Sequence, residues 1–180
     1  MDRPGNDMSR RALLTSGIGA FVTVLIAGCA NTGAAKTSGP ASTSKPSNAL
    51  DLTYENFERQ TVALVDHLGK PLVVNFFASW CAPCVTEMPE FDEVFRSVGQ
   101  RINFLGLAVN DPISESQRLV EKTGISYPVG RDTQGELLAF FGGKAMPTTA
   151  FLDANGNLRL VQSRSYKAAE LQAKLNEIFP

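Results

Sequence analysis

Two cysteines lie three positions apart in the pentapeptide WCAPC, which spans residues 80–84. The chain contains only three cysteines, so few other thiols could partner this pair. Two thiols this close can form a structural disulfide, supply half of a metal site, or act as a redox centre. On a first helical turn, cysteines at i and i+3 have Cα atoms about 5–5.5 Å apart, which is within disulfide range.

Two of these three possibilities are weak. A structural zinc site needs four ligands, and the only other cysteine or histidine side chains are Cys29 and His67. A disulfide between Cys81 and Cys84 closes a very short loop, so it removes little entropy from the unfolded chain and stabilises the fold little. The residue types and spacing therefore favour a redox centre.

The position of WCAPC indicates how the two thiols would differ. The apolar run 72–78 predicts a buried strand before it, and the spacing of apolar residues over 83–98 predicts a helix after it. Cys81 would then lie at a helix N-terminus, where comparable sites lower a cysteine pKa from about 8.5 to about 7 or below. Cys84 would lie one turn further in and be more buried. We therefore expect Cys81 to attack and Cys84 to resolve the mixed disulfide.

The elements around this site alternate between strands and helices. Further strands are expected at 103–109, 148–152 and 157–162, further helices at 114–123, 134–141 and 167–179, and a small leading hairpin at 50–53 and 61–65. Gly124 would cap the helix over 114–123. This order predicts an α/β fold in which a mixed sheet carries helices on both faces.

The first 28 residues have the layout of a signal peptide. Arg3, Arg10 and Arg11 precede an uncharged, mostly apolar run over 12–27, which is short for a membrane-spanning helix. The run ends in LIAGC, which resembles the bacterial lipobox, in which the cysteine, here Cys29, is lipidated after cleavage. The segment SRRALL also resembles a twin-arginine export motif, and general secretion is the open alternative.

Residues 29–48 predict a flexible tether between this lipid anchor and a domain over 49–180. The stretch 31–48 is rich in small and polar residues and contains no large apolar side chain, so it cannot bury a core. Cleavage before Cys29 would remove three arginines and two aspartates from a chain of net charge −1, which leaves about −2. Nucleic acid is therefore not an expected partner, and membrane attachment would depend on lipid. Export would also place the chain where disulfides persist.

The segment VVNFFASWCAPCVTEMPEF, residues 73–91, resembles the active-site region of the thioredoxin superfamily, and more closely its extracytoplasmic TlpA/ResA/DsbE-like oxidoreductases. The segment AMPTTAFLD, residues 145–153, matches the family's second landmark. The resemblance implies a thioredoxin fold, a redox-active Cys81–Cys84 disulfide, and a cis-proline loop at Met146-Pro147. In that loop Pro147 would receive the substrate backbone, with Trp80, Met146 and Thr148 as further substrate contacts. A simple packing role is the alternative for Trp80.

One position departs from the cytosolic thioredoxins. Those proteins carry a buried aspartate six residues before the first cysteine, where this chain has Asn75. Glu87, three residues after Cys84, occupies the position of the acidic residue in TlpA/ResA-type segments. The resemblance implies that Glu87 tunes thiol acidity or moves protons, and a solvated surface glutamate is the alternative. A carboxylate near Cys81 should raise the thiol pKa, because like charges disfavour each other.

The expected function is an extracytoplasmic thiol–disulfide oxidoreductase that needs no cofactor, because the sulfur atoms carry the electrons. Its partners would be exported proteins with thiols or disulfides. If the protein is a reductant, the resemblance implies a membrane electron donor of the DsbD/CcdA kind and a role in cytochrome c maturation. A disulfide-forming oxidant is the alternative. A thiol peroxidase is less expected, because WCAPC lacks the usual polar residue a few positions before the reactive cysteine. A lipid-anchored binding module is the non-enzymatic alternative.

Overall fold

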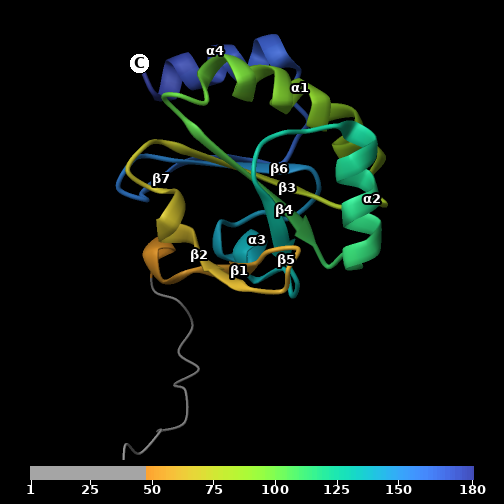
Figure 1. The fold of residues 1–180 in the computed structure, drawn as a ribbon. Helices are drawn as coiled ribbons and strands as arrows, with labels where there is room; N and C mark the ends of the chain where they lie inside the picture. The colour runs from red at the N-terminus through yellow and green to blue at the C-terminus, as the bar shows by residue number, and fades with distance from the viewer. Residues whose placement is uncertain (1–47) are drawn as a thin grey trace, which may run out of the picture. The chain divides into compact units, whose positions relative to one another are not determined.

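The computed structural model describes residues 48–180, and Figure 1 shows their arrangement. The elements follow in the order η1 (Ala49–Asp51), β1 (Thr53–Glu55), β2 (Thr61–Ala63), η2 (Leu64–His67), β3 (Leu72–Phe77), α1 (Ala82–Val98), β4 (Asn103–Val109), α2 (Ile113–Thr123), β5 (Val129–Asp132), α3 (Glu136–Phe140), β6 (Thr148–Leu152), β7 (Leu158–Gln162) and α4 (Ala168–Ile178). Within these residues the strands form one sheet in the order β2-β1-β5-β4-β3-β6-β7.

The sheet is mixed and lies between two layers. β3 pairs in parallel with β4 and antiparallel with β6. Residues of α1, α2 and α4 pack on one face, whereas Leu137 of α3 and residues of the N-terminal segment pack on the other. This arrangement confirms the predicted α/β fold with helices on both faces, and it is a thioredoxin-like fold.

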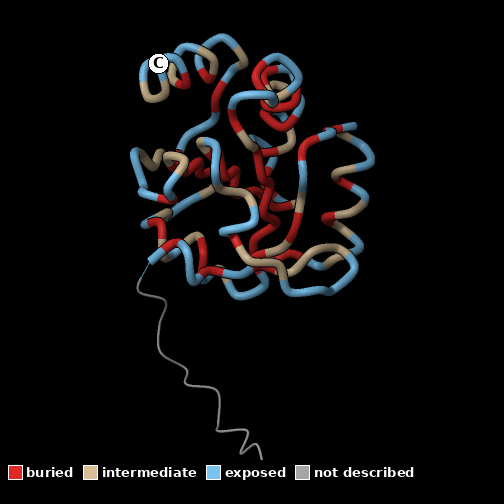
Figure 2. Tube along the Cα trace, turned by 60° about the vertical axis from the view of Figure 1, so that its left-hand side comes forward, coloured by how far each residue is buried: buried red, intermediate tan, exposed pale blue. Residues whose placement is uncertain are grey.

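β3 is an interior strand, between β4 and β6, and is buried along its whole length. Its side chains alternate between the two faces, as the pleat requires. Val73 and Phe77 belong to the core under α1, whereas Val74 and Phe76 belong to the opposite core. Figure 2 shows this buried centre in red, with the exposed residues on the outer surface. The strand therefore delivers the residues that follow it to a fixed place at one end of the sheet.

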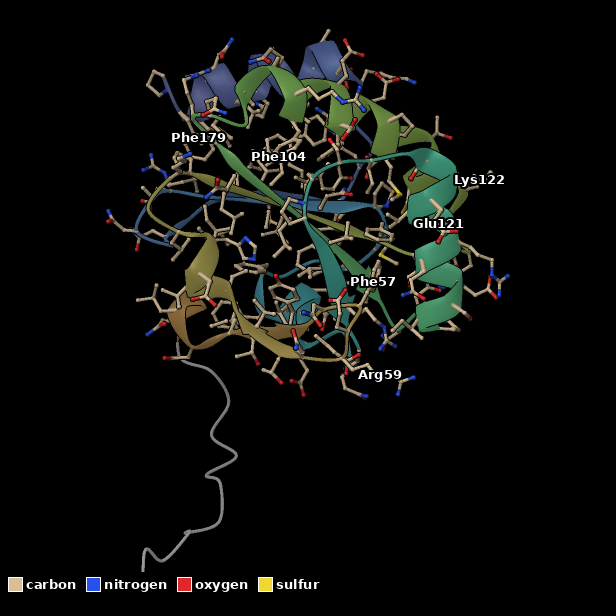
Figure 3. The ribbon with its side chains drawn as sticks, viewed as in Figure 1. Phe57, Arg59, Phe104, Glu121, Lys122 and Phe179 are labelled. Atoms are coloured by element: carbon tan, nitrogen blue, oxygen red, sulfur yellow. A yellow bond between two sulfur atoms is a disulfide. The ribbon has the colours of Figure 1, made fainter. Side chains whose placement is uncertain are left out.

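Aromatic rings fill the space between the sheet and α1. The ring of Phe104 on β4 meets the rings of Phe91 and Phe95 from α1 with centroids 6.4 and 5.6 Å apart. Figure 3 shows Phe104 between the sheet and the helices, while Glu121 and Lys122 of α2 point outward. The face of α1 that carries these phenylalanines is thus the predicted apolar face.

The structure corrects the sequence-based prediction in two places. The first strand of the leading hairpin lies at Thr53–Glu55 and not at 50–53, whereas the second begins at Thr61 as predicted and ends at Ala63. Asn48 Oδ1 accepts hydrogen bonds from the backbone N–H groups of Leu50 and Asp51, and residues 49–51 form a 3-10 turn instead of a strand. The prediction also omitted β5, which pairs in parallel with β4. Gly130 is required there, because a Cβ at this position would lie 2.4 Å from the ring of Tyr54.

Candidate active site

The two cysteines of WCAPC form a disulfide at the start of α1. Their Cα atoms are 5.3 Å apart, within the range expected from the spacing. Cys81 is the N-cap residue, and its Sγ accepts a hydrogen bond from the backbone N–H of Cys84 at 3.3 Å. Cys81 retains 5% of its surface, whereas Cys84 is fully buried. The outer sulfur therefore lies where the free N–H groups of the helix favour a negative charge.

The Met146-Pro147 bond is cis, as the resemblance to the family implies. β6 begins at the next residue, Thr148, which pairs with Phe76 near the end of β3. Because the two strands run antiparallel, the Met146-Pro147 loop lies beside the end of β3 that leads to Cys81. The register of the sheet thus brings both family landmarks to one end of the sheet.

The side chain of Thr148, the first residue of β6, points into the protein. It is fully buried, its hydroxyl donates to the carbonyl oxygen of Ala145 at 2.6 Å, and it lies 2.7 Å from the hydroxyl of Ser163. The side chain is therefore held inside the protein, and the assignment of Thr148 as a substrate contact stays a prediction. The sequence could not show this burial, because the partner Ser163 lies beyond β7.

Trp80 and Met146 border a common pocket of about 240 Å³, which Asn110, Leu138 and Lys144 also line. Trp80 is 66% exposed, so it does not serve as a core residue. An exposed indole next to a redox disulfide offers apolar contact area for a docking chain. These two predicted substrate contacts thus lie together at the surface.

Glu87 is buried, and the surface-glutamate alternative is wrong. Its Oε1 accepts a hydrogen bond from Asn75 Nδ2 at 2.8 Å, and its Oε2 accepts one from the backbone N–H of Tyr166 at 3.2 Å. Burial raises the pKa of Glu87 from its ordinary 4.5 to about 7, although the two hydrogen bonds act in the opposite direction. Glu87 can therefore gain or lose a proton near neutral pH.

A surface pocket adjoins Glu87. Glu87 lines a surface pocket of about 370 Å³ together with Pro83, Thr86, Ser165 and Lys167. Pro83 lies inside the CAPC segment, so the pocket borders the disulfide turn itself. The sequence indicated the acid but not its partner Tyr166, which lies far along the chain and contributes only a backbone group.

The lipid anchor, a metal site and a membrane-spanning helix are considered in turn. Cys29, the expected lipidation site, lies outside the described residues. Within residues 48–180, no cluster of His, Cys, Asp and Glu side chains could hold a metal ion. In the same part of the chain, each helix is too short or too polar to span a bilayer.

Residues 47–161 match the model of the AhpC/TSA family. The chain belongs to this family. A relative named thiol-disulfide oxidoreductase ResA, from Geobacillus thermodenitrificans strain NG80-2, is 28% identical over 135 residues, which are 74% of this chain and 78% of ResA. The AhpC/TSA assignment and the thioredoxin-like fold agree with the resemblance seen in residues 73–91 and 145–153.

Solved structures of the same fold carry related names. A thiol:disulfide interchange protein from Chlorobium tepidum TLS superimposes with a TM-score of 0.64 and 28% identity, covering 76% of this chain and 99% of that protein. The exposed lipoprotein thioredoxin of Streptococcus pneumoniae strain TIGR4 superimposes with a TM-score of 0.59 and 28% identity, covering 71% of this chain and 98% of that protein. Together with the Cys81–Cys84 disulfide, these relatives identify this AhpC/TSA protein as a thiol–disulfide oxidoreductase.

Proposed function

We propose that this protein is an extracytoplasmic, lipid-anchored reductant of protein disulfides, with Cys81 as the attacking thiol. The observation that carries the proposal is the placement of Cys81. It is the N-cap of α1 and the more exposed of the two sulfurs, and it accepts the N–H of Cys84. A thiolate there is stabilised by the helix N-terminus and can be reached by a substrate.

The reaction moves two electrons from the protein to its substrate. The thiolate of reduced Cys81 attacks one sulfur of a substrate disulfide, forms a mixed disulfide, and expels the other substrate sulfur as a thiolate. Cys84, once deprotonated, attacks the Cys81 sulfur and releases the first substrate sulfur. The substrate leaves as a dithiol after taking up protons, and the protein keeps the Cys81–Cys84 disulfide.

Glu87 is suited to accept the proton of Cys84. It lies on the next turn of α1, where residues i and i+3 are neighbours, and its pKa of about 7 matches proton exchange near neutral pH. Ionised Glu87 also opposes a second negative charge nearby, so we expect it to raise the pKa of Cys81. Pro147 would receive the substrate backbone, as in the thioredoxin superfamily, with Trp80 and Met146 beside it.

Insulin reduction by dithiothreitol tests the activity. Wild-type protein should accelerate the reaction, and Cys81→Ser should reduce the rate to background. Cys84→Ser should instead accumulate a mixed disulfide between Cys81 and the substrate, because the resolving thiol is missing. Background rates for wild-type protein, or a mixed disulfide on Cys84 in the Cys81→Ser variant, would overturn the assignment of roles.

The reduction potential of the Cys81–Cys84 couple tests the direction of electron flow. A strongly reducing value supports a reductant that converts an apocytochrome c disulfide to its two thiols before haem attachment, with electrons supplied by a membrane donor of the DsbD/CcdA kind. An oxidising value would overturn this role in favour of disulfide formation in exported proteins. The resemblance to TlpA/ResA/DsbE-like proteins supports the reducing direction.

Membrane attachment through Cys29 has its own test. The LIAGC sequence and the featureless stretch 31–48 support a lipoprotein whose domain begins near residue 49, and a similar structure bears the name exposed lipoprotein thioredoxin. Cys29→Ala should release the protein from the membrane fraction or leave an uncleaved precursor. Unchanged fractionation together with unchanged mature mass would refute the anchor.

A further inference from the structure

A single carboxylate holds the segment between β3 and Cys81. Asp111, just beyond the end of β4, accepts a hydrogen bond from the backbone N–H of Ser79 on Oδ2 at 2.9 Å and one from the Ser79 hydroxyl on Oδ1 at 2.7 Å. Ser79 lies two residues before Cys81. Asp111 is buried and Ser79 is half-buried, so both hydrogen bonds are partly shielded from water and are strengthened by the charge.

Asp111 is itself held from two other elements. The hydroxyl of Ser116, on α2, donates to Asp111 Oδ2 at 2.8 Å, and Ser116 is fully buried. Arg131 Nη2, on β5, donates to the backbone oxygen of Asp111 at 3.2 Å, and Arg131 also forms an ion pair with Glu55 of β1. The carboxylate that meets Ser79 is therefore fixed by the sheet and by α2.

Ser79 in turn decides where Cys81 lies. The backbone N–H of Cys81 donates to the carbonyl oxygen of Ala78 at 3.1 Å, which closes a turn with Ser79 inside it. Cys81 then caps α1, with its Sγ 3.3 Å from the backbone nitrogen of Cys84. A shift of Ser79 would move this sulfur away from the helix N–H groups, which stabilise a thiolate only at close range.

We propose that Asp111 is a positioning residue that, by holding Ser79, keeps Cys81 Sγ at the N-terminus of α1 and so maintains its reactivity. The inference rests on the proposed role of Cys81 as the attacking thiol. The expected positioning effect of Asp111 on the Cys81 thiolate is opposite in sign to the effect of its charge. The negative charge of Asp111 alone would disfavour the Cys81 thiolate, whereas its positioning effect favours that thiolate. Two other charged groups line pockets with the neighbours of Cys81: Glu87 on α1 shares one with Pro83, and Lys144, in the loop before β6, shares one with Trp80.

The fold contains a matched control for this contact. Asp92 on α1, also buried, accepts hydrogen bonds on Oδ1 from the backbone N–H of Ser126 at 2.5 Å and from the Ser126 hydroxyl at 2.7 Å. This pair repeats the chemistry of Asp111 and Ser79 but joins α1 to the segment between α2 and β5. Ser79→Ala and Ser126→Ala therefore remove the same kind of hydrogen bond at two places.

The pH dependence of Cys81 alkylation by iodoacetamide, followed by peptide mapping of reduced full-length protein, tests the proposal. Both alanine variants should lower the thermal midpoint to a similar extent. Ser79→Ala alone should raise the Cys81 pKa, and so slow alkylation at pH 7 by about threefold. Ser79→Thr keeps the hydroxyl and should restore the wild-type profile, and Asp111→Asn should shift the profile in the same direction as Ser79→Ala.

Two results would overturn the proposal. Profiles for Ser79→Ala that coincide with those of Ser126→Ala would show that the contact is only structural. A lower Cys81 pKa in Asp111→Asn would show that the charge of Asp111 outweighs its positioning effect. Failure of the proposed function is separate, because it would appear as absent insulin reduction by the wild-type protein, whereas alkylation compares variants without turnover.

Discussion

Asn75 Nδ2 donates a hydrogen bond to Glu87 Oε1 at 2.8 Å, inside the core and between residues twelve positions apart. The pair joins the interior strand β3 to α1, the helix that begins at the disulfide. Cytosolic thioredoxins have their acid at the position of Asn75, so here the acidic group comes from the helix and the strand supplies its hydrogen-bond donor. This exchange has consequences that can be measured.

The stability of the oxidised protein should depend on pH through Glu87. Its folded-state pKa of about 7 exceeds its ordinary 4.5, so the folded state binds the proton more tightly. The resulting stabilisation is complete below about pH 4.5 and is lost as the pH rises through 7. Between pH 5 and 8, wild-type protein should lose on the order of 3 kcal/mol more unfolding free energy than Glu87→Gln. If the unfolding free energies of the two proteins, measured in urea, changed equally with pH across this range, the result would contradict the burial of an ionising carboxyl.

The acidity of Cys81 should change in the same variant. Glu87→Gln removes a negative charge near the thiols, so the Cys81 pKa should fall and alkylation by iodoacetamide near pH 7 should be about threefold faster. Glu93→Gln, on an exposed position of the same helix, is the control and should leave the profile unchanged. If the pH–alkylation curves of Glu87→Gln and wild type coincided, Glu87 would have no influence on Cys81 and would not belong to the site.

An acid at position 75 of β3 should destabilise the protein as long as Glu87 is present. Asn75→Asp replaces the donor to Glu87 with a second buried carboxyl, and two adjacent carboxylates cannot both ionise at low cost. The pair should share a proton near neutral pH, and the variant should lose about 2 kcal/mol or more of unfolding free energy at pH 8. The loss should shrink at pH 5, where one carboxyl is protonated. A loss that is equal at both pH values would argue against this coupling.

Trp80 should matter for protein substrates and little for small ones. Its exposed indole lies beside Met146 at the disulfide, where a docking chain could bury it. Trp80→Ala should raise KM for a protein disulfide by about tenfold and leave the rate with a small aromatic disulfide nearly unchanged. Leu158→Ala removes an exposed leucine at 45% exposure on the edge strand β7 and should affect neither reaction. Equal losses on both substrates would point to a structural role for Trp80.

Gly130→Ala should destabilise the contact between β5 and the N-terminal hairpin. The added Cβ would lie 2.4 Å from the Tyr54 ring and 2.9 Å from the backbone oxygen of Glu55. We expect a loss of about 2 kcal/mol in unfolding free energy, because the backbone oxygen cannot move aside as a flexible side chain would. A variant as stable as wild type would show that β1 shifts freely against β5.

Local patterns allowed much of the fold to be predicted from the sequence. The bounds of β4 match the prediction, and α2 begins one residue early at Ile113 and ends before Gly124 as expected, because apolar periodicity and a capping glycine are local signals. β5 escaped prediction, since Pro128, Gly130 and Arg131 interrupt any apolar run there. That strand forms because the free edge of β4 and the packing of Tyr54 favour it, and both are tertiary effects.

In the candidate site too, some features follow from local sequence and others depend on tertiary contacts. The spacing of Cys81 and Cys84 is local, so the sequence alone predicts their pairing and the order of burial. The burial of Glu87 and the contact between Asp111 and Ser79 depend on which strands lie side by side, which the sequence does not state. One signal for Asp111 was nevertheless present: it follows the end of the buried strand 103–109, and parallel neighbours bring their carboxyl ends together at one edge of a sheet.

The second hydrogen bond to Glu87 comes from the main chain of Tyr166. The main chain and the side chain of Tyr166 therefore have separate roles. Any amino acid except proline would supply the same N–H, so the acid keeps its partner whatever side chain occupies position 166. The tyrosine side chain has contacts of its own: its ring meets Phe91 and Phe151 edge to face, the Arg164 guanidinium lies 4.1 Å from its centroid, and its hydroxyl donates to Gln162 Oε1. Homologues could therefore exchange this ring for another core residue while the proton chemistry of Glu87 is inherited unchanged, and covariation between the two positions would not reveal their contact.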